Sequence, residues 1–445
     1  MRSTATSYRR ILVGTLLVGA AAYVIAFAGC SSGSGGGGAT DDAGGGGAAR
    51  TDGAATLPDG ALPDRAVVPG SCVLVPGTTC PRLGWTLLLA APSKFTNLIQ
   101  HALAVADDGL HLAAAGTTFT VAGQPLGDKG LVVAHVGFDG TFLGHESFAT
   151  KRVWSIDLGA TGDAGYAAAG EFDGYLTRDG MGVDAGSNPN VNTQQAAAFA
   201  IGADTQTRWI DFAFGAPSSL VSAATISVVL PDGRSLIGGA GSNANLELRT
   251  AGGVVTYRTT LSGMNALAYD RSDGGVWMTR RVGAELHVGK LAVEDGGAGT
   301  TMLVATSFDR VYLSVRPEGG PVVAYQVGSN VEVRAFDSSG TLKWSGSTAW
   351  PAKMELRSVA GVTGGAAIVG SDTNGNGDVF ERFGSGGGAA TTRYSWRSGH
   401  EVSDLVRGPD DALYYSYGGF YSDVAALTRL DSGGGRSVWV SRLPD

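Results

Sequence analysis

The sequence has few of the residues that most often carry chemistry. Among 445 residues there are three cysteines and six histidines, and Asp, Glu, Lys and Arg together make up 16%. No H-E-x-x-H or C-x-x-C spacing occurs, which leaves a zinc site formed by neighbouring residues without support. No phosphate-binding loop, Ser/His/Asp arrangement or quinone-binding signature can be assigned. The net charge of −8, without a cluster of Lys or Arg, argues against nucleic acid as a partner.

Helical patterning is also missing, and short strand-like runs take its place. From Ala102 onwards no segment shows the i, i+3, i+4, i+7 apolar spacing of a long amphipathic helix. Instead a unit of two hairpins recurs, each hairpin having an apolar run, a turn rich in Asp and Gly, and a second run. Asp and Gly supply the positive φ angles that tight hairpins need. The first turns of the seven units lie at 107–109, 162–165, 231–233, 272–274, 317–319, 363–365 and 409–411.

Two hairpins per unit predict a four-stranded antiparallel sheet. We therefore predict an all-β protein, a seven-bladed β-propeller of four-stranded antiparallel blades over residues 93–445. Six or eight blades, a β-sandwich array and an open solenoid are the alternatives. Several units carry an aromatic residue in the late strand, which we expect near the rim; these residues are Trp209, Tyr257, Trp344, Trp396 and Trp439.

Residues 1–29 have the pattern of a signal peptide. A basic start precedes an apolar run at 11–27, and Cys30 follows two small residues. This arrangement resembles the bacterial lipobox, whose cysteine is diacylated and becomes the first residue. We expect Cys30 to carry the lipid, and a residue other than Asp at Ser31 resembles the outer-membrane default of lipoprotein sorting. An uncleaved transmembrane anchor is the alternative, because the run approaches the length that spans a bilayer.

Two segments separate the lipid site from the predicted propeller. Residues 30–70 are rich in Gly and Ala and cannot bury a core, which predicts a disordered tether. Residues 71–92 form a connector in which Cys72 and Cys80 flank a Pro-Gly turn. Export to an oxidising compartment favours a disulfide between them, with two free thiols as the alternative. Trp85 lies in a run typical of an outer strand, which we expect to add to the edge of the last blade.

The later hairpins resemble known bacterial repeats. Residues 198–203, 377–383 and 423–433 look like degenerate copies of a "GDVFVAKLDxxG" phrase. That phrase is typical of the propeller repeats called SBBP or delta-60-like, which are common in secreted lipoproteins of myxobacteria. Residues 333–344 also resemble the PQQ-like propeller repeat. The resemblance implies a propeller and an envelope location, and it transfers no catalytic residue.

One loop has the start of a calcium-binding pattern. Side-chain oxygens alternate along it at Asp372, Asn374, Asn376 and Asp378, with a glycine at position six. The acid expected at position twelve is missing, so Glu381 at position ten would have to replace it. A polar strand connector is the alternative reading of so short a motif. Apart from this calcium ion, we expect no cofactor.

Two other features are less specific. His101 and His111 flank one predicted hairpin, and His135 and His145 the next, but each fits an ordinary strand-surface residue. Residues 173–193 form the longest connection, and their low apolar content predicts a disordered or decorative insertion. If the propeller has a binding face, we expect it on the side of this insertion.

Together these features predict a non-catalytic lipoprotein of the cell envelope. An anchor, a tether and a rigid scaffold suit the recognition of a protein or glycan by a monomer held at the outer membrane. One alternative is a hydrolase, lyase or oxidoreductase whose residues converge on the channel mouth from separate blades. The other is an outer-membrane assembly factor. Clustered carboxylate, His or Arg side chains in the channel would favour the enzyme, and an apolar groove at the rim would favour binding.

Overall fold

The computed structural model describes residues 72–73, 83–90 and most of 101–430. Within 101–430 the gaps are 122–123, 139–140, 161–164, 185–193, 215–223, 240–243, 373–377, 397–400, 410 and 419–423. All described residues belong to the second of two compact units, Thr56–Asp445. They form strands and turns and contain no helix, which confirms the prediction of an all-β protein.

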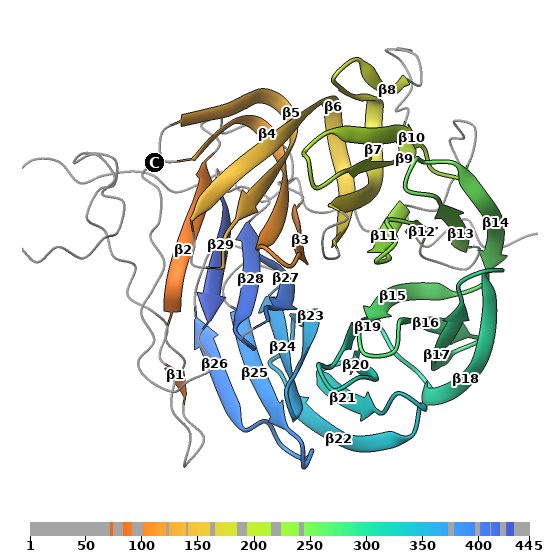
Figure 1. The fold of residues 1–445 in the computed structure, drawn as a ribbon. Coiled ribbons are helices and arrows are strands. Elements are labelled where there is room, and N and C mark those ends of the chain that lie inside the picture. Colours follow the sequence, from red (N-terminus) through yellow and green to blue (C-terminus); the bar gives the residue numbers. More distant parts are fainter. Residues whose placement is uncertain are drawn as a thin grey trace, which may run out of the picture. The chain divides into compact units, whose positions relative to one another are not determined.

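Three of the sheets are four-stranded antiparallel meanders, drawn in green to cyan in Figure 1. The first contains β11 (Ala224–Val229), β12 (Ser235–Gly239), β13 (Ala244–Arg249) and β14 (Val255–Leu261). The second contains β15 (Met264–Asp270), β16 (Gly275–Val282), β17 (Glu285–Ala292) and β18 (Gly297–Ala305). The third contains β19 (Arg310–Val315), β20 (Pro321–Val327), β21 (Asn330–Phe336) and β22 (Leu342–Ala349).

A fourth sheet has five strands, because a short segment from the N-terminal side adds to its edge. It contains β23 (Met354–Val362), β24 (Gly365–Asp372), β25 (Asp378–Gly384), β26 (Thr392–Trp396) and β1 (Cys72–Val73). In the added strand, Cys72 is opposite Tyr394 in the antiparallel register.

The remaining strands belong to one continuous twelve-stranded sheet. Its first members are β3 (His101–Val105), β4 (Leu110–Val121), β5 (Gln124–Val136) and β6 (Phe142–Ala160). The next are β7 (Tyr166–Arg178), β8 (Met181–Asp184), β9 (Gln194–Ile201) and β10 (Thr207–Phe212). The last are β27 (Glu401–Arg407), β28 (Leu413–Gly418), β29 (Val424–Leu430) and β2 (Leu83–Ala90).

Two strands make this sheet continuous. β2 pairs with β29 and, through Ala90 opposite Thr120, with β4. The other is the long strand β6. Its first part pairs with β5 and its second part with β7, so it ends one four-stranded group and begins the next. The register shifts between Thr150 and Arg152 and again between Val153 and Ser155. Such bulges bend a strand and raise its twist. The chain therefore passes between two groups where the repeat predicted a break.

The predicted turns at 107–109, 231–233, 272–274, 317–319 and 363–365 lie where the sequence pattern placed them, between paired strands, whereas 162–164 and 410 of the other two lie outside the described residues. The aromatic residues Trp209, Tyr257, Trp344 and Trp396 lie on β10, β14, β22 and β26, the last strands of their groups. Trp439 lies outside the described residues. In the last group the outer strand is β2, whose Leu87 is opposite Leu427 of β29. The expectation that the Trp85 segment adds to the last group is thus confirmed.

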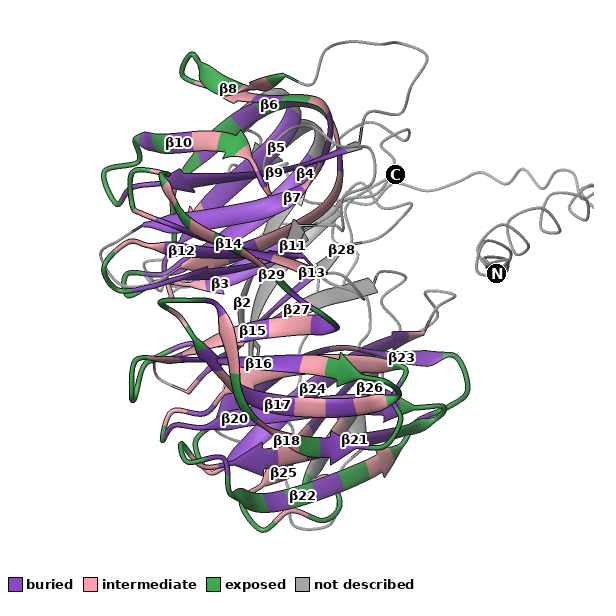
Figure 2. Cartoon of the chain, turned by 90° about the vertical axis from the view of Figure 1, so that its right-hand side faces the viewer, coloured by how far each residue is buried: buried purple, intermediate pink, exposed green. Residues whose placement is uncertain are grey.

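The innermost strands follow one another around a ring. β3, the second part of β6, β11, β15, β19, β23 and β27 each contact the next, and β27 contacts β3 again. Figure 1 looks along this ring, with the groups arranged around a central space. Apolar side chains are buried between the faces of neighbouring sheets, and in Figure 2 buried positions line the strands while exposed positions gather in the turns.

Glycine allows two innermost strands to approach closely. A Cβ atom on Gly361 of β23 would lie 2.5 Å from the main-chain oxygen of Val315 on β19. The Gly361 N–H also donates to Ser314 Oγ at 3.1 Å. This contact joins the inner edges of two sheets, so a side chain at position 361 would force them apart.

The expectation of disorder for the insertion at 173–193 is wrong for its first half, which forms a hairpin, and a decorative role stays a prediction. β7 continues to Arg178 and turns through Asp179 and Gly180, which have φ angles of 54° and 78°. β8 then pairs back on β7, with Arg178 opposite Met181. A two-residue Asp-Gly turn with positive φ at both positions is a strong hairpin signal. The low apolar content of the segment concealed it. Residues 185–193 lie outside the described residues.

Candidate functional site

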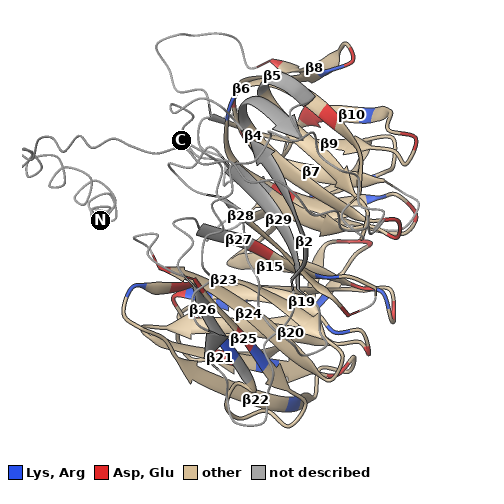
Figure 3. Ribbon diagram, turned by 90° about the vertical axis from the view of Figure 1, so that its left-hand side faces the viewer, with Lys and Arg blue, Asp and Glu red and all other residues tan. Residues whose placement is uncertain are grey.

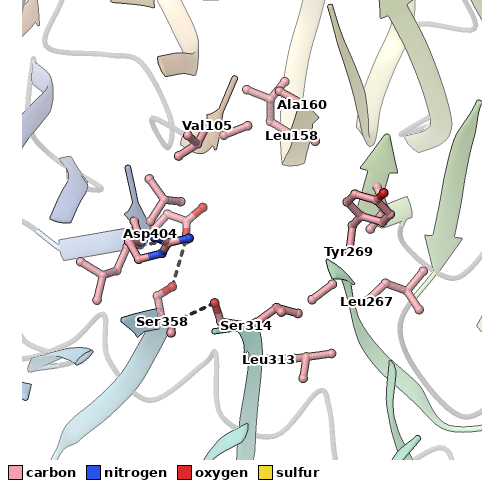
Figure 4. Close-up of a pocket in the computed structure, with 18 of the residues that line it drawn as sticks. Val105, Leu158, Ala160, Leu267, Tyr269, Leu313, Ser314, Ser358 and Asp404 are labelled. Atoms are coloured by element: carbon pink, nitrogen blue, oxygen red, sulfur yellow. Dashed lines mark hydrogen bonds between the residues drawn. The ribbon is translucent and has the colours of Figure 1, made fainter. Parts of the chain in front are cut away.

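A cavity of about 750 Å³ runs along the inner edges of the sheets. Residues of all the innermost strands line it, and Figure 4 shows side chains from several of them facing the same space. Most of the walls are small or aliphatic, as at Val105, Leu158, Ala160, Leu267 and Leu313. This central channel is the candidate site, because a concave cavity with apolar walls and a few polar groups is typical of ligand pockets.

Two aspartates inside the channel tie neighbouring innermost strands together. Asp157 of β6 accepts the Ser227 N–H of β11 at 2.8 Å. Asp404 of β27 accepts the Ser358 hydroxyl of β23 at 2.9 Å. The Leu103 N–H of β3 lies 3.4 Å from the other oxygen of Asp404. Each carboxyl group therefore bridges its own strand and a strand of another group.

Both aspartates hold their protons more tightly than a carboxyl group in water. Burial, and to a smaller extent the nearby Asp404 charge, raise the pKa of Asp157 to about 7 against the opposing hydrogen bond from the Ser227 N–H. Burial also raises the pKa of Asp404, opposed by Ser358 and by main-chain hydrogen bonds. Shifted carboxyl groups in a cleft are a mark of functional sites, although structural networks also produce them.

The end of the channel next to the turns at 107–109, 272–274, 317–319 and 409–411, here called the turn-side mouth, is rich in arginine. Arg271, Arg316 and Arg407 line the channel at or just beyond the ends of their innermost strands. Figure 3 shows charged positions gathered in such turns, with fewer on the strands. The sequence argument favoured the opposite face, and it missed these arginines because they are far apart in the chain.

An ion pair spans the turn-side mouth. Arg271 Nη1 lies 2.7 Å from Asp107 Oδ1, and both side chains are more than half exposed. Arg271 Nη2 also donates to the Val105 carbonyl at 3.4 Å. Asp107 lies in the turn after β3 and Arg271 directly after β15, and these two strands are not neighbours around the ring. The pair therefore joins two separate parts of the rim.

The other two arginines differ in how well they are neutralised. Arg316 is buried and donates to Glu318 and to the carbonyls of Gly319 and Phe336. Arg407 has Asp411 at 3.8 Å, which is at the limit of an ion pair. Its pKa is lowered chiefly by burial, against the pull of Asp411, and also by the positive charge of Arg271.

A second polar cluster lies between β4, β5, β6 and β7. His111 and His135 are opposite each other on β4 and β5, with ring centroids 4.1 Å apart. His135 Nε2 lies 2.9 Å from Glu146 Oε2, and the Tyr166 hydroxyl donates to the same oxygen at 3.1 Å. Burial lowers the pKa of His111 to about 3, with a smaller contribution from His135.

This cluster corrects the expectation for His111, which is not at the strand surface, whereas the exposed His145 fits that expectation. His111 is buried, and its main-chain partner on β3 is Ala104, so it does not face His101. His145 is exposed and stacks on Phe142. The register of β4 against β5 brings His111 to His135, and only the pairing of these two strands reveals that contact.

The predicted calcium loop is described only in part, since Asn374 and Asn376 lie outside the described residues. Asp378 begins β25 and accepts the Ser371 hydroxyl at 2.6 Å. Glu381 is buried on the same strand, 3.2 Å from Arg393. Residues three apart on a strand point to opposite faces. Glu381 is therefore separated from Asp378, and the calcium site stays a prediction.

The remaining sequence-based sites lie at the N-terminal side. Cys30 and Cys80 lie outside the described residues, whereas Cys72 begins the short strand β1. Among the described residues there is no group of three His, Cys, Asp or Glu side chains placed to hold a metal ion. The described part of the chain also contains no helix that is long and apolar enough to cross a membrane.

Comparisons with known proteins give only distant similarity. No family model and no curated protein matches the chain. One similar structure is a protein of unknown function from Bacteroides caccae, with 14% identity, 50% of this chain and 78% of that chain covered, and a TM-score of 0.35. Another is YCF48 bound to D1 peptide, with 11% identity, 80% of this chain and 100% of that chain covered, and a TM-score of 0.42. Neither similarity carries information on a ligand or partner of this chain.

Proposed function

We propose that this protein is a lipid-anchored lipoprotein of the cell envelope whose seven-bladed β-propeller binds a ligand in its central channel. The ligand is a small molecule or the end of a protein or glycan chain. The observation that carries the proposal is the channel, whose volume of about 750 Å³ is typical of ligand pockets, roughly 300–1,000 Å³. Small aliphatic walls with a few converging polar groups match the composition of such pockets.

The count of seven blades rests on the order of the innermost strands. Each of β3, the second part of β6, β11, β15, β19, β23 and β27 begins one group of the meander. In the last group β2 supplies the outer strand through its pairing with β29. Because β2 comes from the N-terminal side and completes the last group, the ring would have no open strand edge at that point. With the repeat phrases, this closure supports membership of the SBBP or delta-60-like propeller repeats.

The location rests on the N-terminal sequence. Cys30 follows a basic start and an apolar run, and a Gly-rich tether separates it from the described strands. We expect Cys30→Ala to release the protein from the membrane fraction. A Cys30→Ala protein that stays in the membrane at full precursor length would show that residues 11–27 are an anchor.

Binding without catalysis is favoured by how the channel carboxyl groups are used. Asp157 and Asp404 both accept hydrogen bonds from main-chain N–H groups of other strands. Carboxyl groups that tie strands together contribute to the scaffold. A rigid ring on a tether can then present its channel to a partner.

An enzyme is the second candidate. It is favoured by the carboxylate and arginine side chains that line the channel and by the raised pKa of Asp157. A carboxyl group with a pKa of about 7 is suited to general acid or base catalysis near neutral pH. Asp404 lies close enough to influence it. In this reading the two groups would exchange a proton with a glycoside or ester held in the channel.

The proposal is tested with the full chain, purified in detergent and screened on glycan and peptide arrays. Ala160→Trp places a large side chain in the channel, and Leu342→Trp makes the same kind of change on the exposed outer strand β22. We expect Ala160→Trp to lose the ligands that the wild type binds and Leu342→Trp to keep them. Thermal melts check that both are folded, with Ala160→Leu as a milder substitute.

Retention of every ligand by Ala160→Trp would remove the channel from the proposal. The enzyme reading has its own test, in which bound glycans are incubated with the protein and analysed for cleavage. Turnover that is lost in Asp157→Asn would favour the enzyme over the binding module.

A further inference from the structure

Three arginines line the turn-side mouth, and their carboxylate partners lie at very different distances. Arg271, Arg316 and Arg407 reach the mouth from three different groups of strands. Arg316 is buried among its own partners and has one carboxylate, Glu318, at 2.8 Å. It is fixed by the carbonyls around it and forms part of the wall. The two arginines that can exchange partners are therefore Arg271 and Arg407.

Arg407 is the less neutralised of these two. Its carboxylate neighbour Asp411 is 3.8 Å away and has other partners. The same carboxylate accepts the Thr363 N–H at 3.0 Å and lies 3.6 Å from Arg382. Glu318, which pairs with Arg316, adds a weaker attraction. Arg407 is also only partly exposed, so water compensates its charge incompletely. A partly desolvated guanidinium with a distant, divided counter-charge favours an additional anion.

Arg271 and Arg407 line the same mouth, and Arg271 donates to the Val105 carbonyl of β3, the strand that contacts β27. The positive charge of Arg271 lowers the pKa of Arg407, after the larger effect of burial. Arg271 is itself held by Asp107, an exposed residue on the far side of the mouth. Exposed ion pairs contribute little to stability. A ligand could therefore replace Asp107 at small cost and would relieve the repulsion between the two arginines.

We propose that the turn-side mouth binds the anionic group of a ligand, a carboxylate or a phosphate, between Arg271 and Arg407, and that this group displaces Asp107. The guanidinium fork matches the geometry of both oxyanions. The inference rests on the proposed function, since the body of the ligand would occupy the same channel. It also defines the class of ligand as an acidic sugar, a sugar phosphate or the carboxyl end of a peptide.

The test is isothermal titration calorimetry of the full chain in detergent, at low ionic strength. The probes are inorganic phosphate, glucuronate and, as the neutral match of glucuronate, glucose. We expect phosphate and glucuronate to bind and glucose to bind at least tenfold more weakly. Arg271→Gln and Arg407→Gln should each lower the affinity for both anions at least tenfold. Asp107→Asn should raise it several-fold, because it removes the competing carboxylate.

Arg234→Gln is the matched control. Arg234 lies in the equivalent turn after β11 and pairs with Asp232 and Glu294, but it does not line the channel. Its loss should leave both affinities unchanged. If Arg234→Gln and Arg407→Gln lowered the anion affinities equally, binding would reflect general charge attraction, and the proposed anion site would be wrong. Absence of anion binding in both the wild type and Asp107→Asn would overturn it as well.

The outcomes separate this inference from the proposed function. If Ala160→Trp abolishes array binding while Arg271→Gln and Arg407→Gln keep it, the channel binds its ligand without the arginines. In that case the anion site is wrong and the channel proposal stands. If phosphate binds as expected but Ala160→Trp keeps every array ligand, the mouth binds anions and the channel does not hold the ligand body.

Discussion

Arg271 and Asp107, 164 positions apart in the sequence, meet at 2.7 Å across one mouth of the central channel. Their innermost strands are separated around the ring by two others on one side and by three on the other. The pair thus forms only because the chain closes into a ring. It also marks the end of the channel where charge is concentrated, and this end differs from the one that the sequence argument favoured.

The close approach of β19 and β23 predicts that any side chain at Gly361 lowers the stability of the fold. In Gly361→Ala the new Cβ would lie 2.5 Å from the Val315 oxygen, and overpacking of this kind costs about 1–3 kcal/mol. Urea unfolding should show a loss in that range. Gly386→Ala is the control, because nothing lies within 4 Å of its Cβ position. Equal stability of the two variants would contradict the close packing of β19 and β23.

The raised pKa of Asp157 predicts that removing this carboxyl group stabilises the fold, and that it does so more at high pH. In the folded protein this carboxyl group has a pKa of about 7, above the value of roughly 3.9 for an unfolded chain. Between these values the folded state binds more protons, so stability falls as the pH rises towards 7. Asp157→Asn should therefore raise the melting temperature more at pH 8 than at pH 4. An equal loss at both pH values would instead assign Asp157 a hydrogen-bonding role only.

For the buried His111 the stability of the fold should change with pH in the opposite direction, falling as the pH becomes acidic. Its pKa of about 3 in the fold lies below its usual 6.5, so the folded state excludes a proton that the unfolded chain binds. Stability is then complete above pH 6.5 and is lost as the pH falls towards 3, by at most about 1.4 kcal/mol per pH unit. His111→Phe should flatten this slope in denaturant titrations. The exposed His145→Phe should not, and a slope unchanged in His111→Phe would refute the assignment.

A buried ion pair within β13 predicts a large loss of stability when one of its charges is removed. Glu247 and Arg249 are fully buried and paired, and Arg249 also lies 2.9 Å from Asp211 of β10. Glu247→Gln leaves Asp211 as the carboxylate partner of the Arg249 guanidinium and also removes the carboxylate partner of Arg258. Breaking a buried pair costs about 3–5 kcal/mol. In urea unfolding we expect the free energy of unfolding to fall by an amount near the lower end of this range. Glu294→Gln, which breaks the exposed pair with Arg234, should cost less than about 1 kcal/mol.

Local features of the fold could be predicted because local residues determine them. Turns such as 231–233 and 272–274 need positive φ, and Asp and Gly provide it within a few residues. The alternation of apolar runs with these turns indicated strands and hairpins, and it also indicated the added strand containing Trp85. The hairpin at Asp179 and Gly180 carries the same signal and was missed, because low apolar content outweighed a clear turn dipeptide.

The candidate site could not be predicted in the same way. Asp157 and Asp404 occupy ordinary strand positions, and their shifted pKa values arise from burial beside strands that are distant in the sequence. His111 meets His135 through the register of β4 and β5, which depends on how one strand is placed against another. A single shift of that register would separate the rings.

The sequence by itself determined the strand class, the positions of the turns and the repeated two-hairpin unit, since these depend on φ preferences and on an apolar period within each unit. Only the tertiary structure decided which residues share the channel. Closing the ring brings the ends of innermost strands together from across the whole chain, so that Arg271 reaches Asp107 and influences Arg407. Charge and desolvation depend on distances in space, and no local pattern records those distances.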